Sequence, residues 1–154
     1  MLRHVNQASR PGSVVTAFQL LVFRIGGHTF AARAEEVNGV QAWPATMPIP
    51  SSTRFITAVA RQHDDVLPVY DLAAQLSLPI RDSAPLALLV KHVQGPLIVR
   101  IDSEIPSLET VGTDMIRPAS GLYPGVWQVC QVAHLEVPML SLRTLGTTQE
   151  SVTA

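Results

Sequence analysis

The chain has 154 residues, of which 47% are hydrophobic, and its 11 basic and 12 acidic side chains give a net charge of −1. This length suits one domain, and the balanced charge argues against nucleic-acid binding, which normally needs a positive excess to neutralise phosphates. Cys130 is the only cysteine, so no intrachain disulfide can form, as is usual in a reducing compartment.

Both ends of the chain are polar and rich in small residues, which predicts disordered tails at 1–13 and 148–154 around one folded domain at 14–147. The apolar stretch at 14–23 is interrupted by polar residues and followed at once by an arginine, whereas a secretory signal has a continuous apolar region. No segment offers the roughly 20 apolar residues that a membrane-spanning helix needs. We therefore expect a cytoplasmic protein.

The first predicted element is a strand at 17–25, in which both alternating sets of side chains are apolar, as in a strand buried on both faces. Gly26-Gly27 predicts a tight hairpin turn into a second strand at 28–32. Glu35-Glu36-Val37 is typical of a single helical turn, and a third strand is predicted at 40–43.

Three prolines between positions 44 and 50 predict an extended connector. Two short strands are then expected at 55–60 and 66–70. Pro68 lacks a backbone N–H, so the second of these strands should run along a sheet edge or carry a bulge. A short helix is predicted at 71–76 with Asp71 as its N-cap.

The second half of the chain repeats this strand-rich pattern and ends in a predicted helical turn at 141–145. Its predicted strands cover residues 86–93, 97–102, 107–111, 126–133 and 137–140. Many short strands separated by Gly and Pro favour a barrel or sandwich fold. A parallel α/β sheet is disfavoured because no helix of about 10–15 residues lies between strands.

Several short motifs follow one another in order along residues 17–146. They are Leu21-Val22-Phe23 with its glycine turn, Glu35-Glu36-Val37, Met47-Pro48-Ile49-Pro50, Leu67-Pro68-Val69-Tyr70-Asp71-Leu72, Ile101-Asp102 and Pro138-Met139-Leu140. Their order and spacing resemble the CheW-like family of chemosensory scaffolds. The resemblance implies an all-β fold with short helices, built from two small five-stranded SH3-like β-barrels packed together.

The resemblance also implies a non-enzymatic adaptor that needs no cofactor. The implied partners are the cytoplasmic tip of a chemoreceptor (a methyl-accepting protein) and the regulatory domain of a CheA-like histidine kinase, in chemotaxis or in a type IV pilus-type system. One departure from the family stands out, because His63-Asp64 replace an Arg-Gly pair. Histidine cannot reproduce the charged fork of arginine, so an adaptor redeployed to a non-chemosensory partner is an alternative.

The candidate partner-binding residues lie in the segments that form the family's receptor-facing surface. They are Val37, Val40, Phe55, Ile56, His63, Val66 and Val69. For the apolar members, ordinary core positions are an equally good interpretation. Leu122 and Tyr123 lie in a turn-like stretch and are candidates for a kinase-facing patch, and the two tryptophans, Trp43 and Trp127, are further candidates because tryptophan is enriched in interfaces.

His63-Asp64-Asp65 is the one cluster that suggests chemistry, since His63 and Asp65 would project to the same side of a strand. Zinc generally needs at least three protein ligands, so a solvated turn is favoured over a metal site. Cys130 lies in an apolar strand, where a thiol is usually inert. We assign no catalytic, cofactor or metal residue. Two alternatives stay open, a metal-assisted hydrolase at His63 and Asp65 and a small-ligand-binding β-barrel with a closed apolar pocket.

Overall fold

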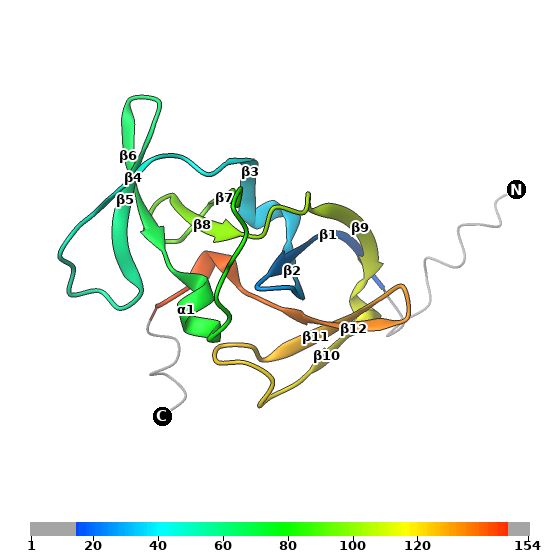
Figure 1. The fold of residues 1–154 in the computed structure, drawn as a ribbon. Helices are drawn as coiled ribbons and strands as arrows, with labels where there is room; N and C mark the ends of the chain where they lie inside the picture. The colour runs from blue at the N-terminus through cyan, green and yellow to red at the C-terminus, as the bar shows by residue number, and fades with distance from the viewer. Residues whose placement is uncertain (1–14, 148–154) are drawn as a thin grey trace, which may run out of the picture.

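The computed structural model describes residues 15–147, so the two predicted tails, 1–13 and 148–154, lie outside the described residues. The described chain is built from short strands with one short α-helix and three 3₁₀ turns (Figure 1). This confirms the all-β fold with short helices that the strand pattern predicts.

Six strands form sheet A, in the order β10-β11-β12-β2-β1-β9. They are β1 (Ala17–Ile25), β2 (His28–Arg33), β9 (Ser107–Gly112), β10 (Ile116–Pro118), β11 (Gln128–Val132) and β12 (Leu135–Met139). The strand and hairpin expected around Gly26-Gly27 are both present, because β1 pairs antiparallel with β2 from Leu20↔Arg33 to Ile25↔His28.

Another six strands form sheet B, in the order β3-β7-β8-β6-β5-β4. They are β3 (Val37–Ala42), β4 (Thr46–Pro48), β5 (Ile56–Gln62), β6 (Asp65–Tyr70), β7 (Leu86–Val90) and β8 (Leu97–Ile101). The helical elements are α1 (Leu72–Leu76) and the 3₁₀ turns η2 (Ala34–Glu36), η3 (Thr113–Met115) and η4 (Leu142–Thr144). Asp71 caps α1 as predicted, since its Oδ1 accepts from the Ala74 amide at 3.0 Å.

Each sheet has six strands where five were expected, and the difference lies in two very short strands. β4 and β10 contain three residues each, and both include a proline. β4 pairs with β5 and β10 pairs with β11, so each extends a sheet by one short edge strand. The connector predicted at 44–50 is therefore a paired strand over part of its length.

Pro68 was predicted to need an edge strand or a bulge, but β6 is an interior strand between β5 and β8. Its parallel pairing with β8 begins only at Val69, one residue after the proline. On the side of β6 that faces β8, therefore, no partner strand requires an N–H group from Pro68. The β5–β6 pair also carries a register irregularity between Ile56 and Ala58.

The two halves of the chain share one order of elements and exchange strands. Each half has a hairpin (β1–β2 or β7–β8), then four more strands, then a short helical turn (α1 or η4). The β1–β2 hairpin lies in the same sheet as β9 to β12, and the β7–β8 hairpin lies with β3 to β6. Parallel pairs join the exchanged parts, β12 to β2 and β6 to β8.

Three apolar clusters follow from this arrangement. The central core lies between the sheets and includes Phe23 and Phe30 from sheet A with Leu88 and Val99 from sheet B. Two smaller clusters lie within the individual sheets. Sheet A holds Leu20, Ala31, Val111, Cys130, Val132, Val137 and Met139, and sheet B holds Ala60, Leu67, Val69, Ala87 and Ile98. Because neighbouring residues of β1 enter different clusters, the expectation that this strand is buried on both faces is confirmed.

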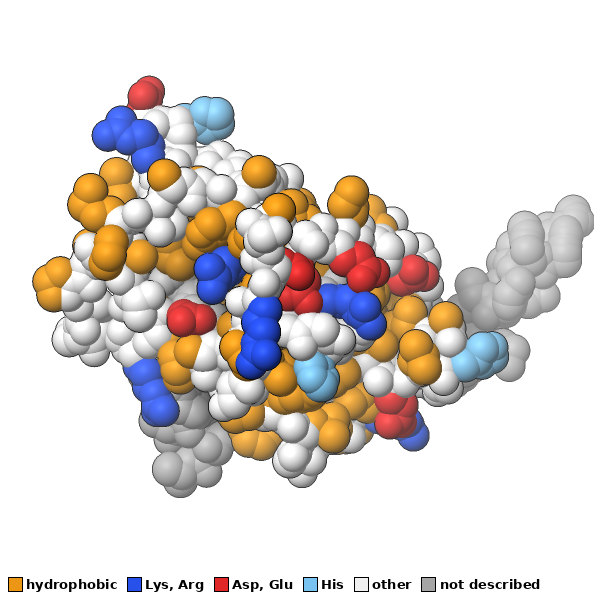
Figure 2. Space-filling view, viewed as in Figure 1, with side chains coloured by type: hydrophobic (Ala, Val, Ile, Leu, Met, Phe, Trp, Pro, Cys, Tyr) orange, Lys and Arg blue, Asp and Glu red, His pale blue; other side chains and the backbone are white. Residues whose placement is uncertain are grey.

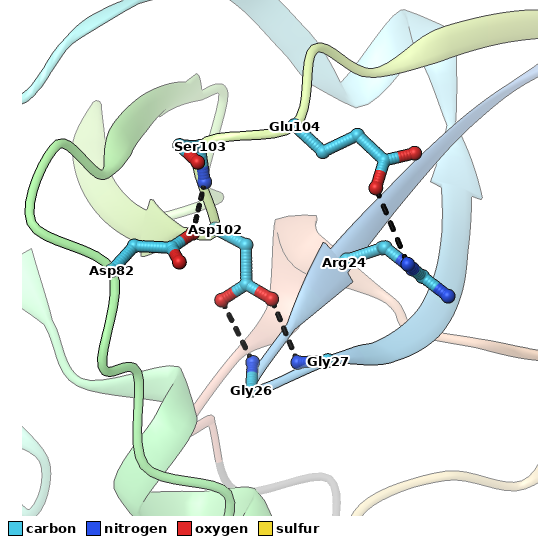
Figure 3. A network of polar contacts seen from close by, with 7 residues as sticks. All are labelled: Arg24, Gly26, Gly27, Asp82, Asp102, Ser103 and Glu104. Carbon is cyan, nitrogen blue, oxygen red and sulfur yellow. Dashed lines mark hydrogen bonds and ion pairs between the residues drawn. The ribbon is translucent and has the colours of Figure 1, made fainter.

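A polar network fixes the β1–β2 turn against the end of β8 (Figure 3). The two oxygens of Asp102, a residue only 8% exposed, accept from the amides of Gly26 at 2.8 Å and Gly27 at 2.7 Å. Both glycines have positive φ, 59° and 85°, where a side chain would be strained. The carboxylate thus adds two charge-assisted hydrogen bonds to this turn.

Candidate partner-binding groove

Two neighbouring hollows lie along the junction of the sheets. The first has a volume of about 880 Å³ and is lined by segments of both sheets, including Phe55, Trp127 and Leu140. The second has a volume of about 600 Å³ and lies beside β6 and the β7–β8 turn. Tyr70, Leu145 and Gly146 line both hollows. The two hollows therefore adjoin each other, and together we call them the groove.

The groove is open to solvent and mainly apolar. Its lining includes the aromatic side chains of Phe55, Tyr70 and Trp127, the last of them 62% exposed. Phe55 and Tyr70 pack with ring centroids 5.9 Å apart. A closed apolar cavity was the feature expected of a small-ligand-binding barrel, whereas an open apolar groove suits a segment of another protein.

Three of the residues predicted for the receptor-facing surface line the groove. Phe55 lies in the first hollow, and Ile56 and Val66 lie in the second. Phe55 adopts a positive φ of 66°, which is unusual for a bulky residue. The sequence pattern therefore points to this surface, although it could not show that its segments converge.

The remaining receptor-side candidates lie elsewhere. Val69 is 7% exposed in the core of sheet B, so its side chain is not available to a partner, and the core interpretation is the right one for this residue. Val37 is partly buried against the central core. Val40 is 40% exposed on β3 but does not line the groove. His63 is exposed in the β5–β6 turn.

The possible kinase-facing pair is divided between surface and core. Leu122 is half exposed, whereas Tyr123 packs edge-on against Phe30 with ring centroids 5.0 Å apart. The Tyr123 hydroxyl is also 3.2 Å from Nδ1 of His28. Trp43, the other tryptophan, packs on the sheet B cluster beneath the Arg100 guanidinium. Tyr123 and Trp43 thus have structural contacts of their own.

The His63 turn differs from the expected strand. His63 has φ 57°, so the same-side projection of His63 and Asp65 along a strand is wrong. The positive φ falls on His63 and not on Asp64, so this backbone does not require the glycine that the family has at position 64. Within residues 15–147, no three His, Cys, Asp or Glu side chains gather closely enough to hold a metal ion.

Several groove residues escaped the sequence analysis because no local pattern marks them. Arg54 places its guanidinium 4.9 Å from the Phe55 ring centroid. Gln75 of α1 donates to the Pro124 carbonyl at 3.3 Å and accepts from the Tyr70 hydroxyl, so it joins the two sheets across the first hollow. The one sequence signal for this part of the groove was Trp127, because tryptophan is enriched in interfaces.

Two buried side chains fix the last turn, which forms one wall of the groove. Oε1 of Glu36 accepts from the Leu142 amide at 2.9 Å, and Nε2 of His92 lies 2.7 Å from the Leu145 carbonyl. Burial raises the pKa of Glu36, while hydrogen bonds from the Leu142 and Arg143 amides oppose the rise. Leu145 and Gly146 are therefore held in place by contacts to the first half of the chain and to the β7–β8 turn.

The family pattern described as the CheW-like domain matches residues 19–145 of this chain. The chain belongs to the CheW-like domain family. The strand pairing, the Asp102 anchor and the groove are thus features of a CheW-like domain, and the family resemblance expected from the motifs is confirmed.

Named relatives agree with this assignment. This CheW-like chain is 27% identical over 101 residues to a probable chemotaxis protein CheW of Rhizobium etli, and 22% identical over 101 residues to a chemotaxis protein CheW of Rhizobium meliloti. Each match covers 65% of this chain and 65% of the relative, just under two thirds of those proteins. The scaffolding protein TtCheW of Thermoanaerobacter tengcongensis shares the fold with a TM-score of 0.73 at 14% identity, over 84% of this chain and 92% of that one.

Glu36→Gln is expected to remove one pH-dependent component from the stability of this CheW-like domain. Because the folded pKa of Glu36 lies above its ordinary value of 4.5, its favourable contribution is full below that pH and is lost as pH rises through the folded pKa. The variant should therefore gain stability relative to wild type as pH rises. Urea unfolding of both proteins between about pH 4 and pH 7 measures the difference, and parallel pH profiles would contradict it.

No helix within residues 15–147 is both long and apolar enough to cross a bilayer.

Proposed function

We propose that this CheW-like domain is a non-enzymatic chemosensory adaptor. It couples the cytoplasmic tip of a chemoreceptor to the regulatory domain of a CheA-like histidine kinase, in chemotaxis or in a type IV pilus-type system. The observation that carries the proposal is the open apolar groove at the junction of the two sheets. Relatives named as chemotaxis proteins and a like-folded scaffolding protein support it.

The groove offers what helix-in-groove binding requires. Such binding takes most of its affinity from a few apolar side chains buried at the centre of the contact. Trp127 and Phe55 in the first hollow, with Ile56 and Val66 in the second, supply apolar surface for those anchors. The proposed mode of action is surface complementarity, and the proposed place of action is the cytoplasm.

A second surface would be needed to hold a kinase while a receptor occupies the groove. Hydrophobic side chains gather over β4 to β6, whereas basic and acidic side chains lie across the middle of the same face (Figure 2). Met47 of β4 is 66% exposed, and Leu122, in the loop between β10 and β11, is 50% exposed. Large exposed apolar patches usually mark protein contacts. On a separate loop, Leu122 with the partly buried Tyr123 beside it remains our candidate for the kinase side.

Recovery of a receptor or a CheA-like kinase from native cells by the tagged full-length chain tests the proposal. His63→Arg is the informative variant, because His63 occupies the position of the family's arginine and its side chain is exposed. We expect the variant to recover about two- to tenfold more partner, since arginine adds a permanent charge and a fork of donors. Asp114→Lys, which adds positive charge on the exposed η3 turn, is the control.

The outcomes separate the two candidate roles. Recovery of neither receptor nor kinase by a folded protein would overturn the coupling role. It would favour an adaptor redeployed to another partner, an alternative suggested by the loss of the family's Arg-Gly pair at His63-Asp64.

A further inference from the structure

The loop between β10 and β11, residues 119–127, contributes to both proposed partner surfaces. Pro124, Gly125 and Trp127 of this loop line the first hollow of the groove. Leu122 of the same loop is 50% exposed and belongs to the candidate kinase-facing pair. Because one short loop contains residues of both surfaces, its position relative to the groove affects the binding of two partners.

The side chain of Gln75 connects this loop to a residue that the two hollows share. Figure 1 shows α1, which contains Gln75, beside the loop. Nε2 of Gln75 donates to the Pro124 carbonyl at 3.3 Å, and its Oε1 accepts from the Tyr70 hydroxyl. Tyr70 is only 2% exposed and lines both hollows. One amide group therefore links a buried residue of sheet B to a loop of sheet A.

Gly125 allows Gln75 to approach the loop closely. A Cβ atom at position 125 would lie 2.6 Å from Nε2 of Gln75, so an alanine there would displace the amide. Gly125 has φ 82°, where a side chain is also strained. Gly121 of the same loop has φ 81°, but a Cβ atom there would meet nothing within 4 Å. The two glycines thus separate the contact with Gln75 from the strain of the backbone.

Two other residues attach the loop to the central core without involving Gln75. Val126 is 1% exposed in that core, and the Tyr123 ring packs against Phe30. These contacts should keep the loop folded when Gln75 is replaced. The contribution left to Gln75 is the position of the groove-lining part of the loop.

We propose that Gln75 is a positioning residue that couples the groove to the Leu122 surface. A receptor segment that fills the first hollow contacts Gln75 and Trp127, and it thereby fixes the loop in one position. A kinase domain that binds at Leu122 then loses less loop entropy, so it binds more tightly. Linkage requires the kinase domain to tighten receptor binding by the same factor. The inference rests on the proposed function, because it takes a receptor and a kinase as the two partners.

An affinity ratio tests the proposal, with the full-length chain, the cytoplasmic tip of the chemoreceptor and the kinase regulatory domain from the same cells. Isothermal titration gives the affinity for the kinase domain without the receptor tip and with the tip at saturation. The ratio of the two affinities should be about fivefold or more in the wild-type chain. Gln75→Leu removes both hydrogen bonds, and Gln75→Glu replaces the donor to Pro124 with an acceptor, so both variants should bring the ratio close to unity. Gln131→Leu, at an exposed position of β11 outside the groove, is the control.

Trp127 reports the position of the loop in the chain alone. In a Trp43→Phe background Trp127 is the sole tryptophan, so acrylamide quenching of fluorescence measures the exposure of its indole ring. Gly125→Ala should shift the quenching constant in the same direction as Gln75→Leu, and it should lower the affinity ratio. Gly121→Ala introduces a similar backbone strain without the contact to Gln75, so it should keep the wild-type values of both.

The outcomes distinguish this inference from the coupling role. Binding of both proteins with a ratio near unity in the wild-type chain, or with a ratio that Gln75→Leu leaves unchanged, would overturn the inference and leave the coupling role standing. An equal loss in Gly121→Ala and Gly125→Ala would do the same, because the effect would then come from backbone strain. If neither protein binds the folded chain, the coupling role fails, and the inference fails with it.

Discussion

Phe30→Ala should lower the free energy of unfolding by about 3–5 kcal/mol, the usual cost of removing a large aromatic side chain from a core. Phe30 is 0% exposed in the central core, and the Tyr123 ring packs edge-on against it. The cavity left by the substitution would lie where the two sheets meet. Urea unfolding measures the loss, and the midpoint of thermal unfolding should fall by about 10 °C or more.

Phe18→Ala is the matched control for this change. Phe18 is only partly buried, at the rim of the sheet A cluster, with the Arg33 guanidinium 4.2 Å from its ring centroid. Its loss should cost about 1 kcal/mol, since little new cavity forms and water can reach the site. Equal losses for the two phenylalanines would mean that the interface between the sheets contributes no more to stability than the surface does.

Asp102→Ala should lower the free energy of unfolding by about 2–4 kcal/mol. The change leaves the Gly26 and Gly27 amides without their charged acceptor, and hydrogen bonds to charged groups are among the stronger ones in proteins. Asp102→Asn should cost less, because its single amide oxygen still accepts from one of the two glycines. Chemical denaturation of the three proteins gives the order, and a larger loss for Asn than for Ala would contradict it.

Asp82→Ala provides a control from the same network. Asp82 is exposed and accepts from the Ser103 amide at 2.6 Å (Figure 3). Water can take over that hydrogen bond, so the substitution should cost less than about 1 kcal/mol. A loss as large as that of Asp102→Ala would place the stabilisation in the whole loop instead of in the turn anchored by Asp102.

The sequence predicts the long and regular elements well because their signals are local. The bounds of β1 at Ala17–Ile25 follow from alternating apolar residues on both faces, and the cap of α1 follows from Asp71 alone. β4 and β10 could not be predicted, because three residues are too few to show a period of two. These strands form because β5 and β11 offer free edges to pair with.

The candidate site was predicted in part, and for a comparable reason. Phe55, Ile56 and Val66 lie close together in the sequence and all line the groove. Arg54 and Leu145 share the first hollow although they are far apart in the chain, so their proximity depends on tertiary structure. Periodicity also could not separate Val69, a core residue, from Val66, which is 60% exposed, because this depends on how closely the neighbouring strands cover each side of β6.

The exchange of strands between the halves has a consequence for how this chain can be divided. Cutting it in the linker between α1 and β7 would give two fragments. Each fragment would have a hairpin that belongs to one sheet and four strands that belong to the other. Neither fragment could complete a sheet from its own residues. Two copies of one fragment, related by a twofold axis, could instead give each other the missing strands and so rebuild both sheets. In its topology, the single chain therefore has the form of a domain-swapped dimer whose two subunits have been fused end to end.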